Sequence, residues 1–313
     1  MSNAERILII KLSALGDFVL SLGACQAIRK HHSGALITLL TTAPYHPLAQ
    51  ASGLFDEIWI DSRPRFWQPL KLLALRSRLR GGRFDRIYDL QRNDRSAFYF
   101  RLIGDPKPEW VGKVAGCSHR YRQPENQILH ISTREAQQLA LAGISDIDPP
   151  DLSFADEDLS IYNLPPDYVL LVPGGAPHRP AKRWPAECYA QLAVWLAERA
   201  YKPVLLGTTA EKDSLERIAA RCPQAIDLCG RTNLLQIATL AKGAALAVGN
   251  DTGPMHLIAP SGCPLVSLFS DESDPTKVSP RGSKTEILQR PSLEDLALAD
   301  VLAACERLLP RLK

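Results

Sequence analysis

Residues 244–259 read Ala-Ala-Leu-Ala-Val-Gly-Asn-Asp-Thr-Gly-Pro-Met-His-Leu-Ile-Ala, and this stretch indicates how the chain folds. Its small apolar beginning, 244–248, is typical of a buried strand, and 257–259 continue in a helical pattern. Between them lie a carboxylate, a hydroxyl, a glycine, a proline and a histidine. A strand, a polar turn and a helix in this order are typical of parallel α/β folds, and such a helix start offers free N–H groups to an anion.

The same alternation of strand and helix extends along the whole chain and occurs twice. It predicts parallel sheets with helices on both faces. A segment rich in proline and acidic residues separates the two series and is interpreted as a linker. We therefore predict two Rossmann-like domains whose sheets face a central cleft. The expected boundaries are 1–150 for the first domain, 151–165 for the linker, 166–290 for the second domain and 291–313 for a C-terminal helix.

Charge is unevenly distributed between the two halves. Residues 1–150 carry 20 Lys and Arg against 14 Asp and Glu, whereas residues 151–313 carry 17 against 20. Residues 63–101 alone hold 11 basic and three acidic side chains. This excess predicts an anionic partner for the first half: a nucleic acid, a membrane surface, or a phosphorylated or carboxylated substrate. The alternative for any single arginine is a solvated helix face.

The seven cysteines are scattered singly, without a C-x-x-C pair, which favours a reducing cytoplasm over a disulfide framework. No apolar run approaches the ~18–20 residues that span a bilayer. The N-terminus enters a strand at once, without the layout of a signal peptide. We therefore expect a cytoplasmic protein.

Ligands of open parallel sheets bind beyond the carboxyl ends of the strands, so polar residues at those ends are the candidates for chemistry. In the first half they are Lys11, Ser13, Gly16, Asp17, Asp89 and Gln91. Two interpretations of Asp17 stay open, a helix N-cap and a general base at the mouth of the cleft.

In the second half the candidates are Gly174, Gly175, Lys182, Gly207, Thr208, Glu211, Asn250, Asp251, Thr252, Gly253 and His256. The two adjacent glycines and the 251–256 turn suit a diphosphate, with Lys182 as a point charge. Glu211 is either a ribose ligand or a surface carboxylate near a helix start. His256 is either a ligand contact or a structural histidine. Neither a dinucleotide fingerprint nor a P-loop is present, and no ligand cluster predicts a metal.

Three blocks of this sequence resemble glycosyltransferase family 9, the ADP-heptose:lipopolysaccharide heptosyltransferases. They are residues 7–17, residues 84–91, and residues 246–257 with their continuation through Gly-Cys-Pro at 262–264, Leu-Phe at 268–269 and Asp-Pro at 274–275. The resemblance runs in order over nearly the whole chain, and the last block is the most specific.

The resemblance implies a GT-B fold, in which the final helix crosses back to the first domain. It implies an inverting transfer that needs no metal and no cofactor, with ADP-heptose as a substrate. The acceptor would be a Kdo- and heptose-containing lipid A or core oligosaccharide, and the enzyme would be peripheral at the inner face of the inner membrane.

Nucleic-acid binding is disfavoured, because few aromatic side chains that could stack on bases lie between the arginines in the sequence.

The resemblance also implies roles for individual residues. Asp17 would be the general base, with Lys11 beside it. The nucleotide sugar would be bound by Gly174, Gly175, Lys182, Gly207, Glu211, Asp251, Thr252, Gly253 and His256. The basic first domain would hold the acceptor, for which we expect Ser13, Arg63, Arg65, Gln91 and Arg92. The physical chemistry agrees, because one base and a positively charged site for the leaving diphosphate suffice for such a transfer.

Three positions and one segment depart from the family pattern: Arg92 and Ser270 stand where glycine is usual, Pro260 interrupts a pair of alanines, and Asp271-Glu272-Ser273 replaces a segment of glycine, proline and threonine character. Two other functions stay open beside the transferase. One is a nucleotide-sugar epimerase or hydrolase that works without an acceptor. The other is a non-catalytic protein of the same fold that binds a nucleotide sugar or a saccharide.

Overall fold

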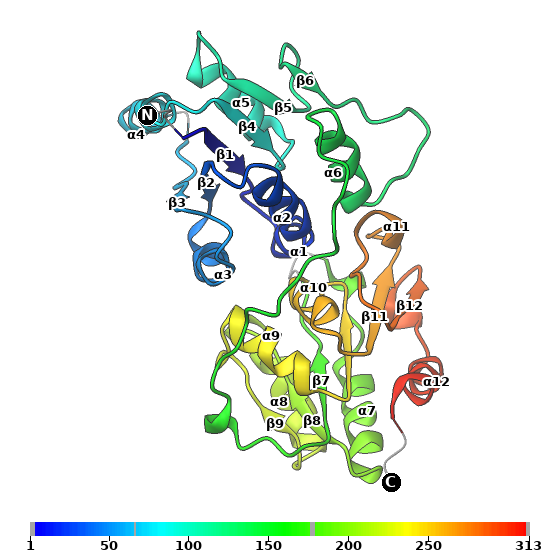
Figure 1. Cartoon of the computed structure of the whole chain (residues 1–313). Helices are drawn as coiled ribbons and strands as arrows, with labels where there is room; N and C mark the ends of the chain where they lie inside the picture. Colours follow the sequence, from blue (N-terminus) through cyan, green and yellow to red (C-terminus); the bar gives the residue numbers. More distant parts are fainter. Residues whose placement is uncertain (1–3, 66, 176–178, 311–313) are drawn as a thin grey trace. The chain divides into compact units, whose positions relative to one another are not determined.

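The computed structural model describes residues 4–65, 67–175 and 179–310. The chain forms two compact units, residues 1–150 and 151–313, each of which is described by itself (Figure 1). Each unit contains a six-stranded sheet in which all neighbouring strands run parallel. This confirms the predicted α/β class with two Rossmann-like sheets.

The sheet of unit 1 has the strand order β3-β2-β1-β4-β5-β6. Its strands are β1 (Arg6–Ile10), β2 (Leu36–Thr41), β3 (Glu57–Ile60), β4 (Arg86–Asp89), β5 (Glu109–Gly112) and β6 (His119–Arg120). The order reverses between β1 and β4, which makes this pair the topological switch point. The short β6 extends the sheet beside β5.

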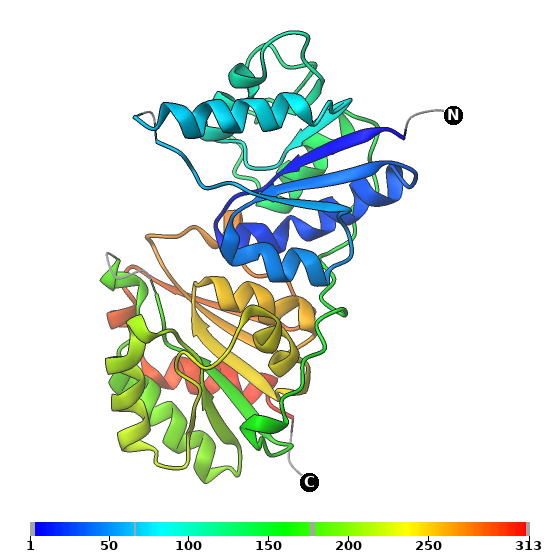
Figure 2. The same cartoon turned by 90° about the vertical axis from the view of Figure 1, so that its left-hand side faces the viewer.

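Helices cover both faces of this sheet. They are α1 (Leu15–Leu20), α2 (Leu22–His31), α3 (His46–Ala51), α4 (Pro69–Gly81), α5 (Asp94–Ile103) and α6 (Ile131–Ala140). Because side chains alternate along a strand, Leu8 and Ile10 point to the face covered by α4 and α5, where they share a core with Leu79 and Tyr99. Figure 2 shows α4 lengthwise across this side of unit 1.

The helical segment after β1 is divided at Ser21 into α1 and α2. The helical hydrogen-bond pattern continues through the division, because the backbone N–H of Ser21 donates to the Asp17 carbonyl at 3.1 Å and that of Cys25 donates to the Ser21 carbonyl at 2.9 Å. The Ser21 hydroxyl oxygen lies 2.8 Å from the same Asp17 carbonyl oxygen. A serine that approaches its own helix in this way often bends it.

The sheet of unit 2 repeats the arrangement in the order β12-β11-β10-β7-β8-β9. Its strands are β7 (Tyr168–Val172), β8 (Lys202–Leu205), β9 (Ile226–Asp227), β10 (Leu246–Asn250), β11 (Leu265–Ser270) and β12 (Thr285–Arg290). Here the order reverses between β7 and β10. β10 is the strand at the start of the stretch 244–259, and it is buried along its whole length.

The helices of unit 2 are α7 (Ala186–Glu198), α8 (Lys212–Arg221), α9 (Leu234–Gly243), α10 (Gly253–Ile258), α11 (Pro275–Val278) and α12 (Leu298–Leu308). One core joins Leu171 and Val248 of the sheet to α7, α8 and α12. α9 and α10 pack against each other and lie outside that core. Gly249 allows this close packing at the end of β10, because a Cβ there would lie 2.5 Å from the Met255 sulfur.

The C-terminal segment ends in α12. The Ser292 side chain caps a short 3₁₀ turn (Leu293–Asp295), and α12 begins at Leu298. The buried face of α12, Val301, Ala304 and Cys305, belongs to the core of unit 2 and contacts α7 and β11. The expected crossing of this helix to the first domain stays a prediction.

The predicted linker 151–165 is bound to unit 2 along part of its length. The Lys242 ammonium donates to the carbonyl of Ser153 at 3.0 Å, and the backbone N–H of Glu157 donates to the Thr239 hydroxyl at 3.1 Å. Among the described residues, no helix combines the length and the apolar character that a membrane crossing requires.

Candidate functional site

The two switch points carry most of the polar residues that the sequence predicts. In unit 1 the turn after β1 supplies Lys11 and Ser13, the start of α1 supplies Asp17, and the turn after β4 supplies Gln91 and Arg92. The carboxyl ends of β1 and β4 are adjacent, since Ile10 pairs with Asp89. The two groups of residues therefore meet at one edge of the sheet, as expected for a ligand site of a parallel α/β fold.

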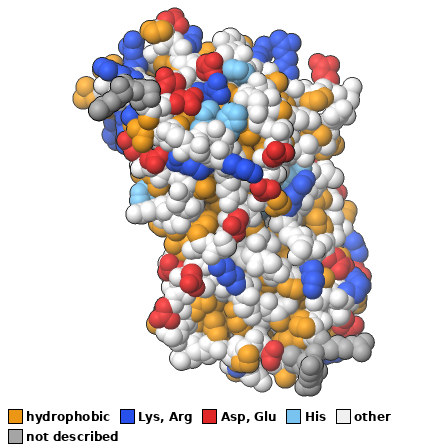
Figure 3. Space-filling model, viewed as in Figure 1, with side chains coloured by type: hydrophobic (Ala, Val, Ile, Leu, Met, Phe, Trp, Pro, Cys, Tyr) orange, Lys and Arg blue, Asp and Glu red, His pale blue; other side chains and the backbone are white. Residues whose placement is uncertain are grey.

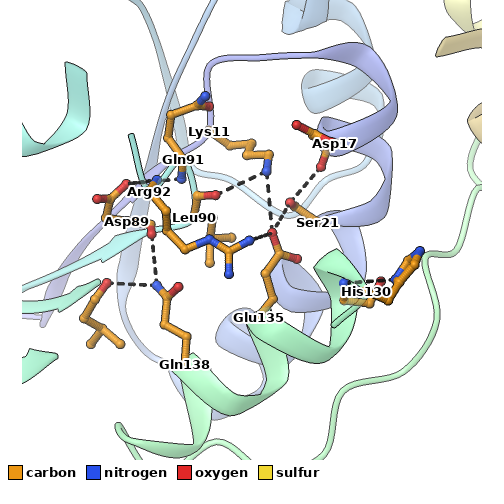
Figure 4. A network of polar contacts seen from close by, with 12 residues as sticks. Lys11, Asp17, Ser21, Asp89, Leu90, Gln91, Arg92, His130, Glu135 and Gln138 are labelled. Atoms are coloured by element: carbon orange, nitrogen blue, oxygen red, sulfur yellow. Dashed lines mark hydrogen bonds and ion pairs between the residues drawn. The ribbon is translucent and has the colours of Figure 1, made fainter. Parts of the chain in front are cut away.

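At the centre of this edge lies Glu135 of α6, whose side chain is only 1% exposed. One of its oxygens, Oε1, accepts a hydrogen bond from the Ser21 hydroxyl at 2.6 Å. The same oxygen lies 3.5 Å from the Lys11 ammonium and 3.7 Å from the Arg92 guanidinium. Figure 4 shows these three donors converging on the one carboxylate from β1, α1–α2 and the turn after β4. A buried carboxylate thus lies between two cations at the strand ends and compensates one of their two charges.

Asp17 lies in the first turn of α1 and is half-buried. It is not the N-cap, because Ala14 occupies that position, so the N-cap interpretation is wrong. Its backbone carbonyl accepts from Ser21, but no hydrogen bond or ion pair of its carboxylate is found among the described residues. A carboxylate without a structural partner at the strand ends is free to accept a proton from a bound molecule.

Asp89, in contrast, is fully used by the fold. Its carboxylate accepts from the backbone N–H groups of Gln91 at 3.1 Å and Arg92 at 2.9 Å. Burial is the largest influence and raises the pKa of Asp89 to about 6, against the hydrogen bonds from Arg92 and Ser96. Asp89 therefore shapes the turn that presents Gln91 and Arg92.

Gln91 connects the turn after β4 to the turn after β1. Its side-chain oxygen accepts from the backbone N–H of Leu12 at 2.7 Å and of Ser13 at 3.1 Å. Arg63 reaches the same turn, because its guanidinium donates to the Leu12 carbonyl at 2.9 Å. Arg65 has its contacts elsewhere, 5.1 Å from the centre of the Trp67 ring. The structure thus brings four of the five expected acceptor residues to one turn region and gives Arg65 different neighbours.

The backbone conformation of Arg92 accounts for the glycine that the family pattern has at this position. Its φ is +50°, in the left-handed region that glycine adopts without strain. The arginine offsets this strain with the contact to Glu135. One of its terminal nitrogens, Nη1, is buried without a hydrogen-bond partner among the described residues.

Arg134 adds a cation that sequence reasoning missed. Burial, and then repulsion from Arg92, lower the pKa of Arg134. Its Nε is also buried without a hydrogen-bond partner among the described residues. Two neighbouring guanidinium groups with unused N–H donors favour an anionic ligand. Arg134 and Glu135 lie in the middle of a helix, where no local motif marks them.

In unit 2 the loop after β7 and the turn after β10 meet at the corresponding switch point. Asn250, completely buried, holds them together: its amide nitrogen donates to the carbonyls of Pro173 at 2.9 Å and Gly174 at 3.0 Å. Its oxygen accepts from Tyr189 at 3.0 Å. Gly175 is the last described residue before 176–178, and its carbonyl accepts from Arg183 at 2.5 Å. The glycine loop is therefore anchored beside Asp251.

Asp251 is the centre of the polar cluster in unit 2. Its Oδ2 lies 2.6 Å from the Lys182 ammonium, which also donates to the Ser273 hydroxyl at 2.7 Å. Its Oδ1 lies 3.9 Å from Nε2 of His256. Burial opposes ionisation, but the contacts with His256, Lys182 and Ser273 outweigh it and lower the pKa of Asp251 to about 2. Sequence reasoning found Lys182 and His256 but missed Ser273.

Two further candidates for binding the nucleotide sugar, Thr252 and Gly253, lie at the start of α10. Thr252 is the N-cap of α10, although its side chain makes no capping bond, and its hydroxyl is buried without a hydrogen-bond partner among the described residues. Gly253 begins α10, which is only six residues long. Pro260, the third departure from the family pattern, lies in the first turn of a 3₁₀ helix, where its missing N–H leaves no bond unmade.

Glu211 combines the two interpretations that the sequence left open. Its Oε2 accepts from the Thr208 backbone N–H at 2.8 Å and hydroxyl at 2.6 Å, which closes a capping box. Its Oε1 lies 3.5 Å from where a Cβ of Gly174 would be. Gly207 is required in this packing, because a Cβ would lie 2.7 Å from Leu215. One carboxylate oxygen is thus structural, and the other lies beside the glycine loop.

Ser270, the second departure, ends β11 and is completely buried, with a hydroxyl that has no hydrogen-bond partner in the described part of the chain. No group of three or more His, Cys, Asp or Glu side chains among the described residues has the arrangement of a metal site.

These two sites lie in a chain whose residues 72–299 match the model of glycosyltransferase family 9 (heptosyltransferase). The chain belongs to glycosyltransferase family 9. It is a glycosyltransferase of the GT-B fold, and the resemblance inferred from the three sequence blocks is confirmed.

Similar proteins extend the comparison over most of the chain. Lipopolysaccharide heptosyltransferase 2 of Escherichia coli is 26% identical, over 91% of this chain and 88% of that protein. Lipooligosaccharide heptosyltransferase 2 of Haemophilus influenzae is 33% identical over a shorter stretch, 37% of this chain and 34% of that protein. The solved structure of Escherichia coli ADP-heptose LPS heptosyltransferase II has a TM-score of 0.79 and 24% identity, covering 97% of this chain and 98% of that one.

Proposed function

We propose that this chain transfers a heptose from ADP-heptose to an anionic inner-core acceptor of lipopolysaccharide, with inversion at the anomeric carbon and without a metal or cofactor. The names of the similar family 9 proteins support the sugar and the acceptor class. The observation that carries the chemical step is the carboxylate of Asp17, which lies at a switch point with no structural partner among the described residues.

In the proposed reaction the acceptor hydroxyl oxygen attacks the anomeric carbon of the heptose. The hydroxyl proton passes to the Asp17 carboxylate. The bond from the anomeric carbon to the diphosphate oxygen breaks, and ADP leaves with the electron pair. A base on the acceptor side is sufficient, because a diphosphate leaving group needs no protonation.

Unit 2 would hold the donor. The Lys182 ammonium is held by Asp251 and Ser273 and would donate its remaining N–H to the departing diphosphate. The glycine loop at 174–175 lets a phosphate approach the backbone, and Oε1 of Glu211 faces that loop, where a ribose hydroxyl can donate to it.

Unit 1 would hold the acceptor. Lys11, Arg92 and Arg134 present positive charge at the end of β1 and β4, and Arg63 is fixed at the same turn. The two guanidinium groups with unused donors match the carboxylate and phosphate groups of an inner-core acceptor. Ser13, Gln91 and Arg65 complete the proposed acceptor region.

The test is an assay with ADP-heptose and a lipopolysaccharide truncated in its inner core. We expect Asp17→Asn to lower kcat by about 100-fold or more, as for the loss of a general base. Asp105→Asn, at an exposed acid of the same unit, is the matched control and should keep full activity. Undiminished turnover by Asp17→Asn would remove Asp17 from the role of base.

Further measurements decide the remaining parts of the proposal. The anomeric configuration of the product, read by NMR, should be opposite to that of the donor. Transfer should persist in excess chelator, and its loss would contradict a metal-independent reaction. Rapid release of ADP or isomerised sugar without an acceptor would favour the epimerase or hydrolase. Binding of ADP with no turnover on any acceptor would favour the non-catalytic alternative.

We also infer that the enzyme works at the cytoplasmic face of the inner membrane, where a lipid-linked acceptor would be available. The basic character of residues 1–150 supports this location. Fractionation of expressing cells, with and without a high-salt wash, tests it. Recovery in the membrane fraction that salt releases is expected.

A further inference from the structure

Residues 63–84 carry seven basic side chains and no acidic one: Arg63, Arg65, Lys71, Arg76, Arg78, Arg80 and Arg83. Most of this stretch is α4 and the segment that leads into it. Three of the arginines are already engaged: Arg63 donates to Leu12, Arg78 lies 4.5 Å from the centre of the Trp59 ring, and Arg65 lies over the Trp67 ring. The basic side chains Lys71, Arg76 and Arg80 of α4 are exposed.

The same surface exposes large apolar side chains. Trp67 is 70% exposed, Leu70 81% and Leu73 57%. Leu70 and Leu73 are three residues apart on one helix face, whereas Leu75 and Leu79 point inward to the core of unit 1. α4 therefore has one apolar face that is buried in the core of unit 1 and a second apolar face that is exposed. In Figure 3 blue and orange atoms lie around the grey atoms at the upper left, the region in which Figure 1 labels α4.

A cavity of about 330 Å³ continues this apolar surface. It is lined by Pro64, Arg65, Trp67, Asp94, Arg95 and Phe98. The guanidinium of Arg65 lies over the Trp67 ring, so positive charge and exposed aromatic surface are combined at its edge. Such a combination is typical of the boundary between headgroups and acyl chains.

We propose that Trp67, Leu70 and Leu73, with Lys71, Arg76 and Arg80 around them, form a docking surface for an anionic lipid bilayer. We call these six residues the α4 patch. Leucine and tryptophan side chains insert into the headgroup boundary, while the basic side chains bind anionic headgroups.

Charge complementarity selects a bilayer over other occupants. The partner must be negative along the whole of α4, which at 13 residues is ~20 Å long, and must also accept three large apolar groups. An anionic bilayer has both properties at every point of its surface. A nucleic acid would favour several stacking aromatic side chains, whereas the large apolar side chains exposed along α4 are the leucines Leu70 and Leu73.

The α4 patch is continuous with the proposed acceptor region. Arg63 and Arg65 precede it in the chain, and Arg63 is bonded to the turn after β1 that leads to Asp17. Docking of α4 would therefore bring lipid headgroups close to the residues that we propose hold the acceptor. This last link rests on the proposed function, whereas the binding of a bilayer does not.

The test is sedimentation of the full chain with vesicles. We expect binding to vesicles of phosphatidylcholine with phosphatidylglycerol, and little binding to pure phosphatidylcholine. Leu70→Ser with Leu73→Ser should weaken binding at least about tenfold, because two apolar side chains no longer insert. The matched control is Ile128→Ser with Ile161→Ser, which changes two similarly exposed apolar residues, 61% and 63%, outside the patch. It should bind as the wild type does.

A second pair of variants tests the charge. Lys71→Glu with Arg76→Glu should abolish binding, and ~0.5 M salt should weaken that of the wild type. Lys212→Glu with Arg217→Glu makes the same change of net charge on α8 and should have a small effect. Circular dichroism of all variants checks that they fold.

Three outcomes would overturn the proposal: no binding of the wild type to either vesicle, equal binding by the leucine variant and its control, or binding to DNA that the leucine variant retains while vesicles are ignored. Loss of a dimer in the leucine variant, without vesicle binding, would assign the surface to a second copy of the chain. Transfer to a water-soluble, deacylated acceptor should be the same in the leucine variant and the wild type. A failure of the proposed function is thus distinguishable from a failure of the docking surface.

Discussion

The Lys182 ammonium lies 2.6 Å from the Asp251 carboxylate, so two residues that the sequence suggests as separate contacts of the nucleotide sugar form one partly buried ion pair. Asp251 does not present a free negative charge to a diphosphate, because its charge is already compensated by Lys182 and Ser273. In this arrangement Asp251 holds the lysine at the end of β10.

The Asp251 contacts predict an acid-sensitive contribution to stability. The pKa of Asp251 is about 2 in the folded chain, below ~3.9 in an unfolded one. The contribution is therefore present above about pH 4 and is lost as the pH falls toward 2. Asp251→Asn should lower the free energy of unfolding by about 2 kcal/mol or more at pH 7, measured with urea, and by clearly less near pH 3.

Asp213→Asn, at an exposed acid of α8, is the control for this experiment. It should change the free energy of unfolding little at either pH. A difference between Asp251→Asn and wild type that stays constant from pH 7 to pH 3 would contradict the ion-pair account.

Asp89 predicts the opposite dependence on pH. Burial holds its pKa at about 6, above the unfolded value, so its ionisation is unfavourable in the folded chain. Stability attributable to this residue therefore falls as the pH rises from about 4 through 6. Asp89→Asn keeps an oxygen for the N–H groups of Gln91 and Arg92 and has no charge. It should be more stable than the wild type at pH 7.5, by about 2 kcal/mol, and similar near pH 4.

Urea unfolding at the two pH values checks this prediction, with Asp105→Asn as the exposed control. If Asp89→Asn is less stable than the wild type at pH 7.5, then the charge of Asp89 is compensated in the fold and the raised pKa is wrong.

Much of this architecture follows from sequence because strand ends are local features. The apolar run ending at Val248 and the polar residues after it identify a switch-point turn, and the run before Lys11 does the same in unit 1. The partners of those residues are not local. Ser21 and Glu135 are 114 residues apart, and no period or motif connects them. The packing of α12 on unit 2 depends on which apolar surface is free after folding, and its amphipathic pattern fits either domain.

Ser21 and Glu135 are expected to contribute jointly to the stability of unit 1 through their hydrogen bond. Ser21→Ala removes the hydrogen bond to Oε1 of Glu135, which keeps only its contacts with Lys11 and Arg92. The free energy of unfolding should fall by about 1–2 kcal/mol. Glu135→Gln leaves Lys11 and Arg92 without their buried counter-charge and should cost about 3 kcal/mol or more. The double variant should cost less than the sum, with a coupling of at least about 0.5 kcal/mol.

Activity separates the role of Glu135 from simple stability. If Glu135 positions Lys11 and Arg92, Glu135→Gln should raise KM for the acceptor more than KM for ADP-heptose, whereas Ser21→Ala should change both little. Additive unfolding free energies in the double variant would show that the 2.6 Å contact does not couple the two residues.

Gly249 predicts a packing defect at the centre of unit 2. A Cβ at this position would lie 2.5 Å from the Met255 sulfur and 2.7 Å from Cβ of Val172, in a buried strand with no space to relax. Gly249→Ala should therefore destabilise the chain by about 1–3 kcal/mol in urea unfolding. Gly34→Ala is the matched control, because no atom lies within 4 Å of the position of its Cβ, and it should be neutral or slightly stabilising.

The same substitution should affect ligand binding. Because β7 and β10 carry the glycine loop and Asp251, Gly249→Ala should weaken ADP binding measured by calorimetry, while Gly34→Ala leaves it unchanged. Equal stability of the two variants would mean that Met255 can move aside and that the close packing of α10 on β10 is not required.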